Sequence, residues 1–438
     1  MTVLKRDIGL LGAILLTFNG IVGAGIFALP GTLHQQFGAF SPWLFPIFGL
    51  LMLLVAVPFA RLAALFSVSG GPVAYVAPFG PAASFQVGWL YYIARITAFA
   101  ANANVFAAYA GALWPPLGSA AGRITVVVLL IGTVTWVNVV GVRRAIRALD
   151  VVTLLKTLPL IGLSIWGLAA SGGAPAPTGL PAFGAFEAAA LVTLYAFIGF
   201  ENSVVPAGET RAPERTIPRA LVATVLTTAA LYFLVQLAYV AVMPAGAAPD
   251  APLAAFAEKL IGPIGVIILS LTAMASVAGN FLGAMTSTPR VTFALADEGL
   301  LPRWFGAVDA RWGTPSRSIL FMGVLGGALA LSGSFVWLAV VSTLARLFVY
   351  AASIAALPAA RHKAGIPIEF GMGLTMAGGL ALCLWAAAQS ALASWTMLGA
   401  LLAVGLLLYA IARRATGSAS SAATVSAIQP PPSNRDPS

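Results

Sequence analysis

Residues 20–27 read Gly-Ile-Val-Gly-Ala-Gly-Ile-Phe and lie inside the first long apolar stretch of the chain. Glycine destabilises a helix by about 1 kcal/mol relative to alanine, so three glycines within six residues predict a weak point in this helix. Close packing against a neighbouring helix is the other interpretation, because small residues four apart are frequent where membrane helices meet. Taken alone, this stretch leaves both interpretations open.

The stretch belongs to a chain that is apolar throughout. Of its 438 residues, 60% are hydrophobic and 8% are charged, whereas a water-soluble domain carries about 25% charged residues. A bilayer core about 30 Å thick requires about 20 apolar residues per helix, so we predict an all-α integral membrane protein with about twelve transmembrane helices. The predicted spans are residues 8–33, 41–66, 84–114, 123–142, 151–170, 187–206, 218–243, 261–291, 319–331, 335–359, 370–389 and 393–412.

The predicted topology accounts for the net charge of +10. Basic residues are held on the cytoplasmic side of a membrane. With a cytoplasmic N-terminus, eighteen of the 23 lysines and arginines fall inside, and only Arg123 and Lys259 fall outside. We predict a multi-pass protein of the cell inner (cytoplasmic) membrane with both termini in the cytoplasm. A nucleic-acid partner is not expected, because the basic residues are spread between apolar runs.

The chain is predicted to end in a disordered cytoplasmic tail, residues 413–438, which follows a transmembrane domain at residues 1–412. The tail holds few side chains large enough to bury, so ordering it would lose more entropy than its contacts return.

Few side chains are suited to catalysis. The chain has 13 acidic residues, two histidines and one cysteine. No His, Cys or paired-carboxylate constellation stands at catalytic spacing. We therefore expect a protein that is not an enzyme, with no catalytic residues, no bound metal and no cofactor.

The sixth predicted span carries a second unusual stretch, Tyr-Ala-Phe-Ile-Gly-Phe-Glu-Asn-Ser at residues 195–203. An ionisable side chain at the bilayer centre costs about 2.5–3.5 kcal/mol, so Glu201 is expected to face a cavity or a partner. Two roles are open for Glu201: a structural carboxylate that bonds to exposed backbone or to an arginine, and a direct ligand contact.

The two glycine-containing stretches occupy corresponding places in the chain. Five crossings separate them, and an odd number reverses the direction in which the second set of helices enters the bilayer. We predict two inverted repeats of five helices, at about residues 8–170 and 187–359, with two extra C-terminal helices at about residues 370–412. Broken helices in matching positions of inverted repeats indicate a transporter site, since unwound backbone is tolerated in a membrane where it lines a cavity.

These residues resemble the amino acid, polyamine and organocation (APC) superfamily of transporters, whose members share the LeuT-type fold of five plus five inverted spans. The resemblance covers about residues 5–412. Its motifs are similar to residues 23–27 in the first span, 69–72 with Tyr75 after the second, 197–201 in the sixth, 208–220 after it, and 290, 296–302 and 314–315 after the eighth. Ala212 stands where the family pattern has asparagine.

The resemblance implies an amino acid permease that works by secondary active transport, with a small-molecule amino acid as its substrate. In such a fold, the first-span break starts a half-helix whose free N–H groups suit a substrate carboxylate. Free carbonyls at the ends of the other half-helices accept hydrogen bonds from the ammonium group. The expected carboxylate donors are the amides of Gly23, Ala24, Gly25 and Ile26, and the expected carbonyls lie near Gly20, Ile21, Phe197 and Ile198. Gly199, Glu201, Asn202 and Ser203 complete the expected substrate site.

Other polar and aromatic residues could line the same cavity. Phe197 matches the aromatic residue that closes over the substrate in relatives, and Tyr195 is a second gate candidate, although either ring could simply pack. Asn102, Asn104 and Asn280 lie inside apolar helices, where hydrogen bonding between helices is the competing role.

Lys156 in the fifth span corresponds to a lysine that replaces a sodium ion in some relatives. Snorkelling towards the cytoplasm is the other interpretation. If Lys156 takes the place of sodium, transport is sodium-independent and either proton-linked or an exchange, because a buried lysine titrates readily. Glu201 is a second candidate for proton coupling.

The charges within the spans bear on the substrate. Three cations, Arg95, Lys156 and Arg346, accompany one clear mid-span carboxylate, Glu201, so uncharged amino acids are favoured over cationic ones. Arg346 either pairs with Glu201 or lies in a watery vestibule. A cationic amino acid or polyamine transporter is the alternative within transport, and a non-transporting amino acid receptor is the alternative class.

Overall fold

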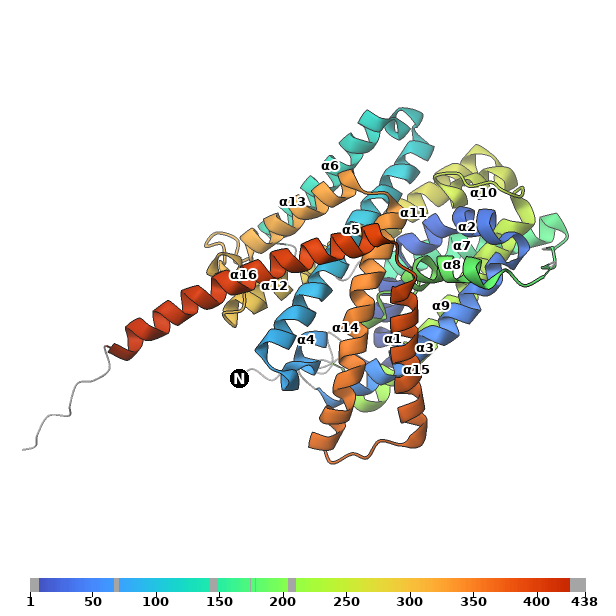
Figure 1. The fold of residues 1–438 in the computed structure, drawn as a ribbon. Coiled ribbons are helices and arrows are strands. Elements are labelled where there is room, and N and C mark those ends of the chain that lie inside the picture. The colour runs from blue at the N-terminus through green and yellow to red at the C-terminus, as the bar shows by residue number, and fades with distance from the viewer. Residues whose placement is uncertain are drawn as a thin grey trace, which may run out of the picture.

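The chain forms a bundle of helices that cross one another at steep angles (Figure 1). The computed structural model describes residues 8–66, 71–141, 149–173, 175–177, 179–203 and 210–425. Its main helices are α1 (Leu10–Ile21), α2 (Ala24–Phe37), α3 (Ser41–Leu65), α4 (Pro72–Tyr75), α5 (Pro81–Leu113), α6 (Ala120–Val140), α7 (Leu149–Ser171), α8 (Phe183–Tyr195), α9 (Pro213–Val242), α10 (Pro252–Ile261), α11 (Pro263–Ser287), α12 (Pro289–Asp297), α13 (Ser316–Ser332), α14 (Phe335–Lys363), α15 (Phe370–Ala388) and α16 (Leu392–Val425).

Both predicted helix interruptions are confirmed. Helix α1 ends at Ile21 and α2 begins at Ala24, with Val22 and Gly23 in non-helical conformations between them. Helix α8 ends at Tyr195, and the chain passes through turns to the short 3-10 helix η5 (Phe200–Ser203). Gly199 lies within these turns at φ +114°, a conformation that favours glycine. The glycines therefore mark true breaks rather than packing positions alone.

Eight helical segments of the described chain are long and apolar enough to cross a membrane. Three shorter apolar helices accompany them, at Leu10–Ile21, Phe183–Tyr195 and Ser316–Ser332. The first two are short because the breaks divide the spans to which they belong. The number of twelve spans and the inverted relation of the repeats remain predictions.

One predicted span is divided where the sequence predicts a single helix. Within residues 261–291, α10 ends and α11 begins at Gly262, whose φ is +67°, and α11 gives way to α12 at Pro289. Pro263 and Pro289 are each the first residue of a helix, where proline loses no intrahelical hydrogen bond. Proline and glycine together explain the extra boundaries.

Helix α16 continues to Val425, past residue 413, where the predicted tail begins. Residues 413–425 are rich in alanine, which has the highest helix propensity and extends the preceding span. The rest of the predicted tail, residues 426–438, lies outside the described residues. In Figure 1 this helix runs out beyond its neighbours.

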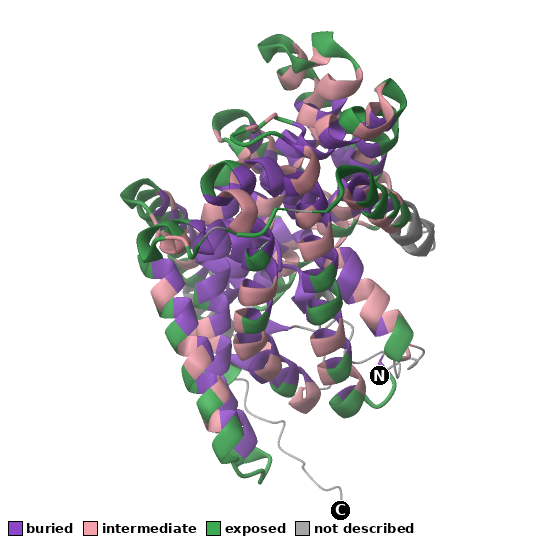
Figure 2. Ribbon diagram, turned by 90° about the vertical axis from the view of Figure 1, so that its right-hand side faces the viewer, coloured by how far each residue is buried: buried purple, intermediate pink, exposed green. Residues whose placement is uncertain are grey.

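Burial separates an inner set of helices from an apolar periphery (Figure 2). Helices α3, α5, α9, α11 and α14 pack most closely, and their interfaces contain many aromatic rings. Large apolar side chains also remain exposed at the outside, including Leu129, Trp136, Val324, Leu374 and Leu407. A water-soluble protein rarely exposes such a contiguous apolar surface, whereas hydrocarbon is its natural solvent.

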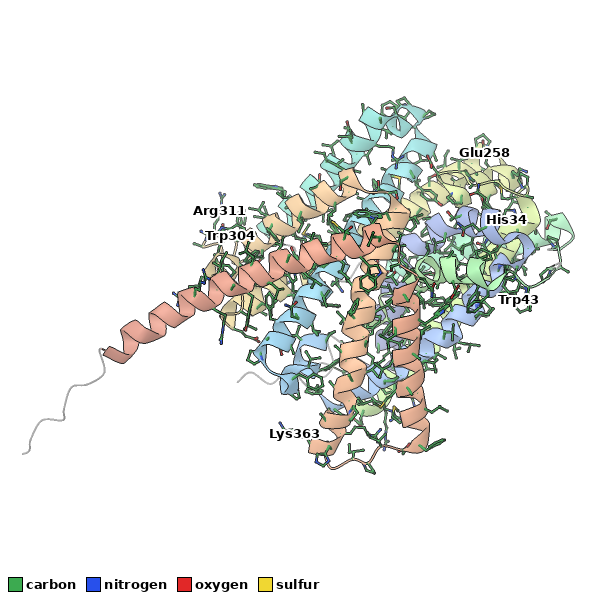
Figure 3. The ribbon with its side chains drawn as sticks, in the orientation of Figure 1. His34, Trp43, Glu258, Trp304, Arg311 and Lys363 are labelled. Carbon is green, nitrogen blue, oxygen red and sulfur yellow. The ribbon has the colours of Figure 1, made fainter. Side chains whose placement is uncertain are left out.

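Several charged and aromatic side chains lie at two opposite sides of the bundle (Figure 3). Arg311, Trp304 and Lys363 lie towards one end, and Glu258 and His34 lie at the opposite side of the molecule. Helix α4, between α3 and α5 in the chain, lies towards the first of these sides (Figure 1). A membrane between the two ends would leave the charged groups at its surfaces.

Candidate functional site

The two breaks touch each other through their backbones. A Cβ atom placed on Gly25 would lie 3.1 Å from Cα of Ala196. A Cβ atom on Gly199 would overlap the carbonyl oxygen of Gly20. Glycine is needed at residue 199, because any side chain there would push the interrupted helices apart, and a side chain at residue 25 would require Ala196 to shift.

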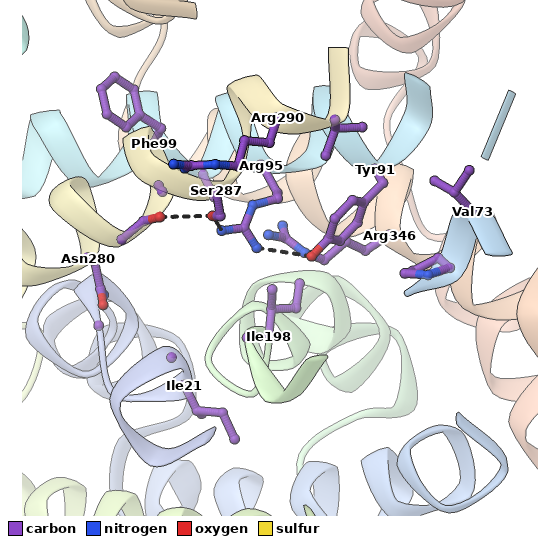
Figure 4. A pocket seen from close by; sticks show the side chains of 18 of the residues that line it. Ile21, Val73, Tyr91, Arg95, Phe99, Ile198, Asn280, Ser287, Arg290 and Arg346 are labelled. Carbon is purple, nitrogen blue, oxygen red and sulfur yellow. Dashed lines mark hydrogen bonds between the residues drawn. The ribbon is translucent and has the colours of Figure 1, made fainter. Parts of the chain in front are cut away.

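A cavity of about 920 Å³ opens beside this junction. Both breaks, α5 and α11 contribute to its lining, together with Phe66, residues of the 72–77 segment and residues of the 290–298 segment. Figure 4 shows Arg95 and Arg346 near its centre and Asn280 beside the α1 break. The predicted site residues that line it are Gly20, Ile21, Gly23, Ala24, Gly25, Asn102, Tyr195, Ile198, Gly199, Asn280 and Arg346.

The α2 half of the first break provides the expected helix N-terminus. Helix α2 has no side-chain cap, and the N–H groups in the first turn of a helix have no partner within it. Ala24 and Gly25 begin this turn and line the cavity, whereas Ile26 is fully buried away from it. The amide of Gly23 differs from expectation, because it donates to the carbonyl oxygen of Ile21 at 2.8 Å within the turn.

The α1 half offers fewer free carbonyls than the sequence suggests. The carbonyl oxygen of Ile21 accepts hydrogen bonds from the Gly23 amide and from the Tyr232 hydroxyl, at 2.8 and 3.1 Å. The expectation that Ile21 supplies a free acceptor is therefore wrong. A tight turn brings backbone N–H groups close to carbonyl oxygens of the same turn. A sequence motif does not show that these carbonyls are already bonded.

Lys156 is fully enclosed by protein at the first break. Its Nζ donates to the carbonyl oxygen of Val22 at 2.7 Å, and to the side-chain and main-chain oxygens of Asn19 at 2.5 and 3.3 Å. Ser276 on α11 also donates to the Val22 oxygen, at 3.4 Å. Only 1% of Lys156 is exposed, so snorkelling is excluded. The ammonium instead joins α7 to the end of α1, next to α11.

Glu201 and Arg346 form a buried ion pair. Arg346 Nε lies 3.0 Å from Glu201 Oε1, and the two side chains are 5% and 1% exposed. Glu201 Oε2 also accepts hydrogen bonds from the Tyr350 hydroxyl and from the Gly199 amide, both at 3.1 Å. Arg346 further donates to the Ala94 carbonyl at 3.0 Å. Glu201 therefore acts as a structural carboxylate that ties η5 to α14, and it does not line the cavity.

The remaining predicted residues divide between the cavity and helix packing. The Tyr195 hydroxyl donates to Asn102 Oδ1 at 3.4 Å, and Asn280 lies against Gly23. Asn104 instead donates to carbonyls at the end of α13, which is the interhelical role. Phe197 does not line the cavity, because its ring packs against Tyr232 at 5.9 Å. Its role as a gate remains a prediction.

Asn202 and Ser203 belong to η5. Their side chains lie outside the described residues, so their expected contact with a ligand also remains a prediction.

The structure adds residues that sequence reasoning missed or left without a role. Asn19 borders the cavity while its Oδ1 accepts from Lys156. Its place directly before the glycine stretch was the available signal. Arg95, noted in the sequence as an unexplained cation inside a span, also borders the cavity, together with Tyr91, Ser287 and Arg290.

The amino acid permease family model matches residues 8–412. The chain belongs to this family. This permease is 30% identical over 334 residues to uncharacterized transporters of Mycobacterium tuberculosis and Mycobacterium bovis, a match that covers 75% of the permease and 74% of each relative. It is 28% identical over 329 residues to the cadaverine/lysine antiporter of Escherichia coli strain K12, covering 73% of each chain.

Among solved structures, the permease resembles that of MhsT in complex with L-phenylalanine, with a TM-score of 0.62 and 14% sequence identity. The match covers 86% of the permease and 98% of MhsT. This likeness confirms the LeuT-type fold. Family, relatives and apolar helices together establish a multi-pass membrane transporter rather than an enzyme.

Proposed function

We propose that this permease carries amino acids with uncharged side chains across the cytoplasmic membrane, by alternating access and without sodium. The observation that carries this proposal is the cavity at the contact of two interrupted helices, with the uncapped start of α2 in its lining. Backbone N–H and C=O groups without helical partners are tolerated inside a membrane where they line a cavity and can bind a ligand.

Both charged ends of a zwitterion find partners at this junction. The amides of the first turn of α2, at Ala24 and Gly25, suit the carboxylate, because free N–H groups and the helix dipole favour an anion. The backbone around Phe197 and Ile198, where α8 has ended, supplies carbonyl oxygens for the ammonium group.

The charges around the cavity support a substrate without a cationic side chain. Glu201 is paired with Arg346 and does not line the cavity, so it is poorly placed as a counter-ion for a basic side chain. Three of the described lining residues are arginines, Arg95, Arg290 and Arg346, and one is acidic, Glu298. A cationic amino acid or polyamine carrier is the alternative, and the name of the Escherichia coli relative supports it.

Lys156 supports transport that does not require sodium. Its ammonium already places a positive charge against the carbonyl oxygens of Asn19 and Val22 at the end of α1. A metal ion at that point would have to displace it. The driving force would then come from a proton gradient or from exchange.

The cavity lining reaches from the two breaks to residues of α4 and α12, which lie towards the end of the bundle that carries Arg311 and Lys363 (Figures 1 and 3). By the distribution of basic residues, we assign this end to the cytoplasm. The conformation would then face inward, with the substrate site reached from the cytoplasm between α4 and α12.

Uptake into proteoliposomes tests the proposal. Labelled neutral, acidic and basic amino acids should be compared with and without sodium and proton gradients. For the amino acid that is carried best, the amine without its carboxyl group and the acid without its amino group should compete at least tenfold more weakly. Equal competition by either analogue would refute zwitterion binding, and uptake that requires sodium would refute the role given to Lys156.

A further inference from the structure

Asn19 connects the buried ammonium group of Lys156 with the cavity. It lies near the end of α1 and is one of the residues that line the cavity. Its Oδ1 accepts a hydrogen bond from Lys156 Nζ at 2.5 Å. Lys156 itself is 1% exposed and is not among the described lining residues. Asn19 is therefore the side chain through which a change at Lys156 can reach a bound ligand.

The ammonium group determines which way the Asn19 amide points. An ammonium carries three N–H donors and no acceptor, so the carbonyl end of the amide must face it. The NH2 end then points away from Lys156, and it donates to no other side chain or carbonyl in the described part of the protein. Because Asn19 is 9% exposed where it lines the cavity, this NH2 group is available to a ligand.

The contacts of Lys156 match the charged amine and not the neutral one. Three oxygens surround Nζ: Oδ1 of Asn19 and the main-chain oxygens of Val22 and Asn19, the last two at 2.7 and 3.3 Å. A neutral amine has two N–H donors and a lone pair, so it would repel one of the three oxygens. The main-chain oxygens cannot turn without moving α1, whereas Oδ1 moves by rotation about one side-chain bond. The same rotation brings an N–H of the amide to the lone pair.

We propose that Asn19 is a positioning residue whose amide rotates by half a turn when Lys156 gains or loses a proton. With a charged Lys156, the amide presents its NH2 group to the cavity and adds a donor for the substrate carboxylate. With a neutral Lys156, it presents its oxygen, which repels that carboxylate. Proton binding and substrate binding then favour each other, and this coupling is reciprocal. The inference rests on the proposed function, and it specifies the proton as the coupling ion.

The other titratable groups around Lys156 are few among the described residues. Helices α1 and α11, which pack against α7, contain no acidic residue, lysine, arginine or histidine. Helix α9 brings the hydroxyl of Tyr232, which donates to the Ile21 carbonyl at 3.1 Å. The charged residues of α9 and α10 lie in the first two turns of α9 or are exposed on α10: Glu214, Arg215, Arg219, Glu258 and Lys259. At 1.5 Å per residue, Arg219 is about 20 Å along α9 from Tyr232.

The charged groups across the cavity differ from Lys156 in their titration or their distance along the chain. Glu201 on η5, which packs against α1, is paired with Arg346. Arginine keeps its charge in proteins, so the lining arginines Arg95, Arg290 and Arg346 do not titrate. Glu298 also lines the cavity, after the end of α12. A variant with a permanent charge at residue 156 separates the titration of Lys156 from that of Glu298.

Binding of the labelled neutral amino acid to purified protein in detergent micelles tests the inference. The Kd is measured from about pH 5 to about pH 9, since a buried lysine titrates readily. For the wild-type protein, the Kd should rise at least tenfold towards the alkaline end, because a hydrogen bond to a charged group changes an equilibrium constant by about tenfold or more. Titration calorimetry in buffers of different ionisation enthalpy should show that binding takes up protons at intermediate pH.

Three variants assign the pH dependence to the amide. Asn19→Ala should bind more weakly at acidic pH, vary less than threefold over the same range and take up no proton on binding. Lys156→Arg keeps its charge throughout and should also lose the pH dependence. Asn138→Ala is the matched control, because Asn138 is a buried asparagine of α6 that bonds to Val134 and Thr286 and is not among the described lining residues. It should retain the wild-type pH profile.

The outcomes separate this inference from the proposed function. If no neutral amino acid binds at any pH, the proposed function fails. If one binds and Asn19→Ala keeps the wild-type pH profile and proton uptake, Asn19 has a structural role and the inference is refuted. A wild-type Kd that does not vary with pH, or a Lys156→Arg variant that retains the wild-type profile, refutes it as well. If Asn19→Ala cannot be purified, Asn19→Leu replaces it, since it keeps the volume of the side chain.

Discussion

Replacement of Glu201 by glutamine should destabilise the permease through the charge that it leaves behind. Glutamine has nearly the same shape and can still accept the hydrogen bonds of Tyr350 and the Gly199 amide. What it removes is the counter-charge of Arg346, whose side chain is 5% exposed. Removing one partner of a buried ion pair typically costs about 3–5 kcal/mol. Because Arg346 borders the cavity, we expect about 3 kcal/mol.

The assay is reversible unfolding in mixed micelles by titration with sodium dodecyl sulfate, which gives the free energy of unfolding. Glu201→Gln, Arg346→Met and the double variant complete a double-mutant cycle. The double variant should be more stable than the sum of the single effects predicts, since no uncompensated charge is then buried. The reasoning is refuted if Glu201→Gln costs less than about 1 kcal/mol, the range of an exposed ion pair, or if the two effects simply add.

Three further substitutions test separate parts of the site. Lys156→Ala should reduce turnover at least tenfold in the uptake assay, because it strips the α1 carbonyls of their ammonium partner; wild-type kinetics would contradict this. Gly199→Ala should cost about 1–3 kcal/mol of stability from its φ of +114° alone, measured by the same titration, and overlap with Gly20 should add to it. Tyr195→Phe loses a 3.4 Å hydrogen bond to Asn102 and should change uptake less than threefold; a larger loss would indicate a direct ligand contact.

The sequence predicts most of the fold because its signals are local. Glycine at residues 20–25 and at residue 199 weakens helices wherever it occurs, and the structure interrupts both spans at these points. The long apolar runs also predict most spans to within a few residues. The division at Pro289 was missed, because a run of apolar residues hides a boundary that depends on one proline.

The candidate site was only partly predictable, because the sequence does not show which distant residues come into contact in the folded chain. The partner of Glu201 lies 145 residues away, so the sequence left Arg346 as one of two possibilities. The carbonyl of Ile21 was expected to be free, but the turn and Tyr232 occupy it. Arg95 stood out as an intramembrane charge, yet its contacts with Ser287 and Thr288, at the end of α11, became visible only when the helices were placed.

Direct contact between the two broken helices has a mechanical consequence. The main chain of Gly25 contacts that of Ala196, and the main chain of Gly199 contacts that of Gly20, with no flexible side chain between them. Neither half-helix can tilt without sliding along the other, so a ligand that shifts one of them displaces its counterpart as well. At residue 199, where an added Cβ would overlap the carbonyl oxygen of Gly20, the same contact excludes any larger residue.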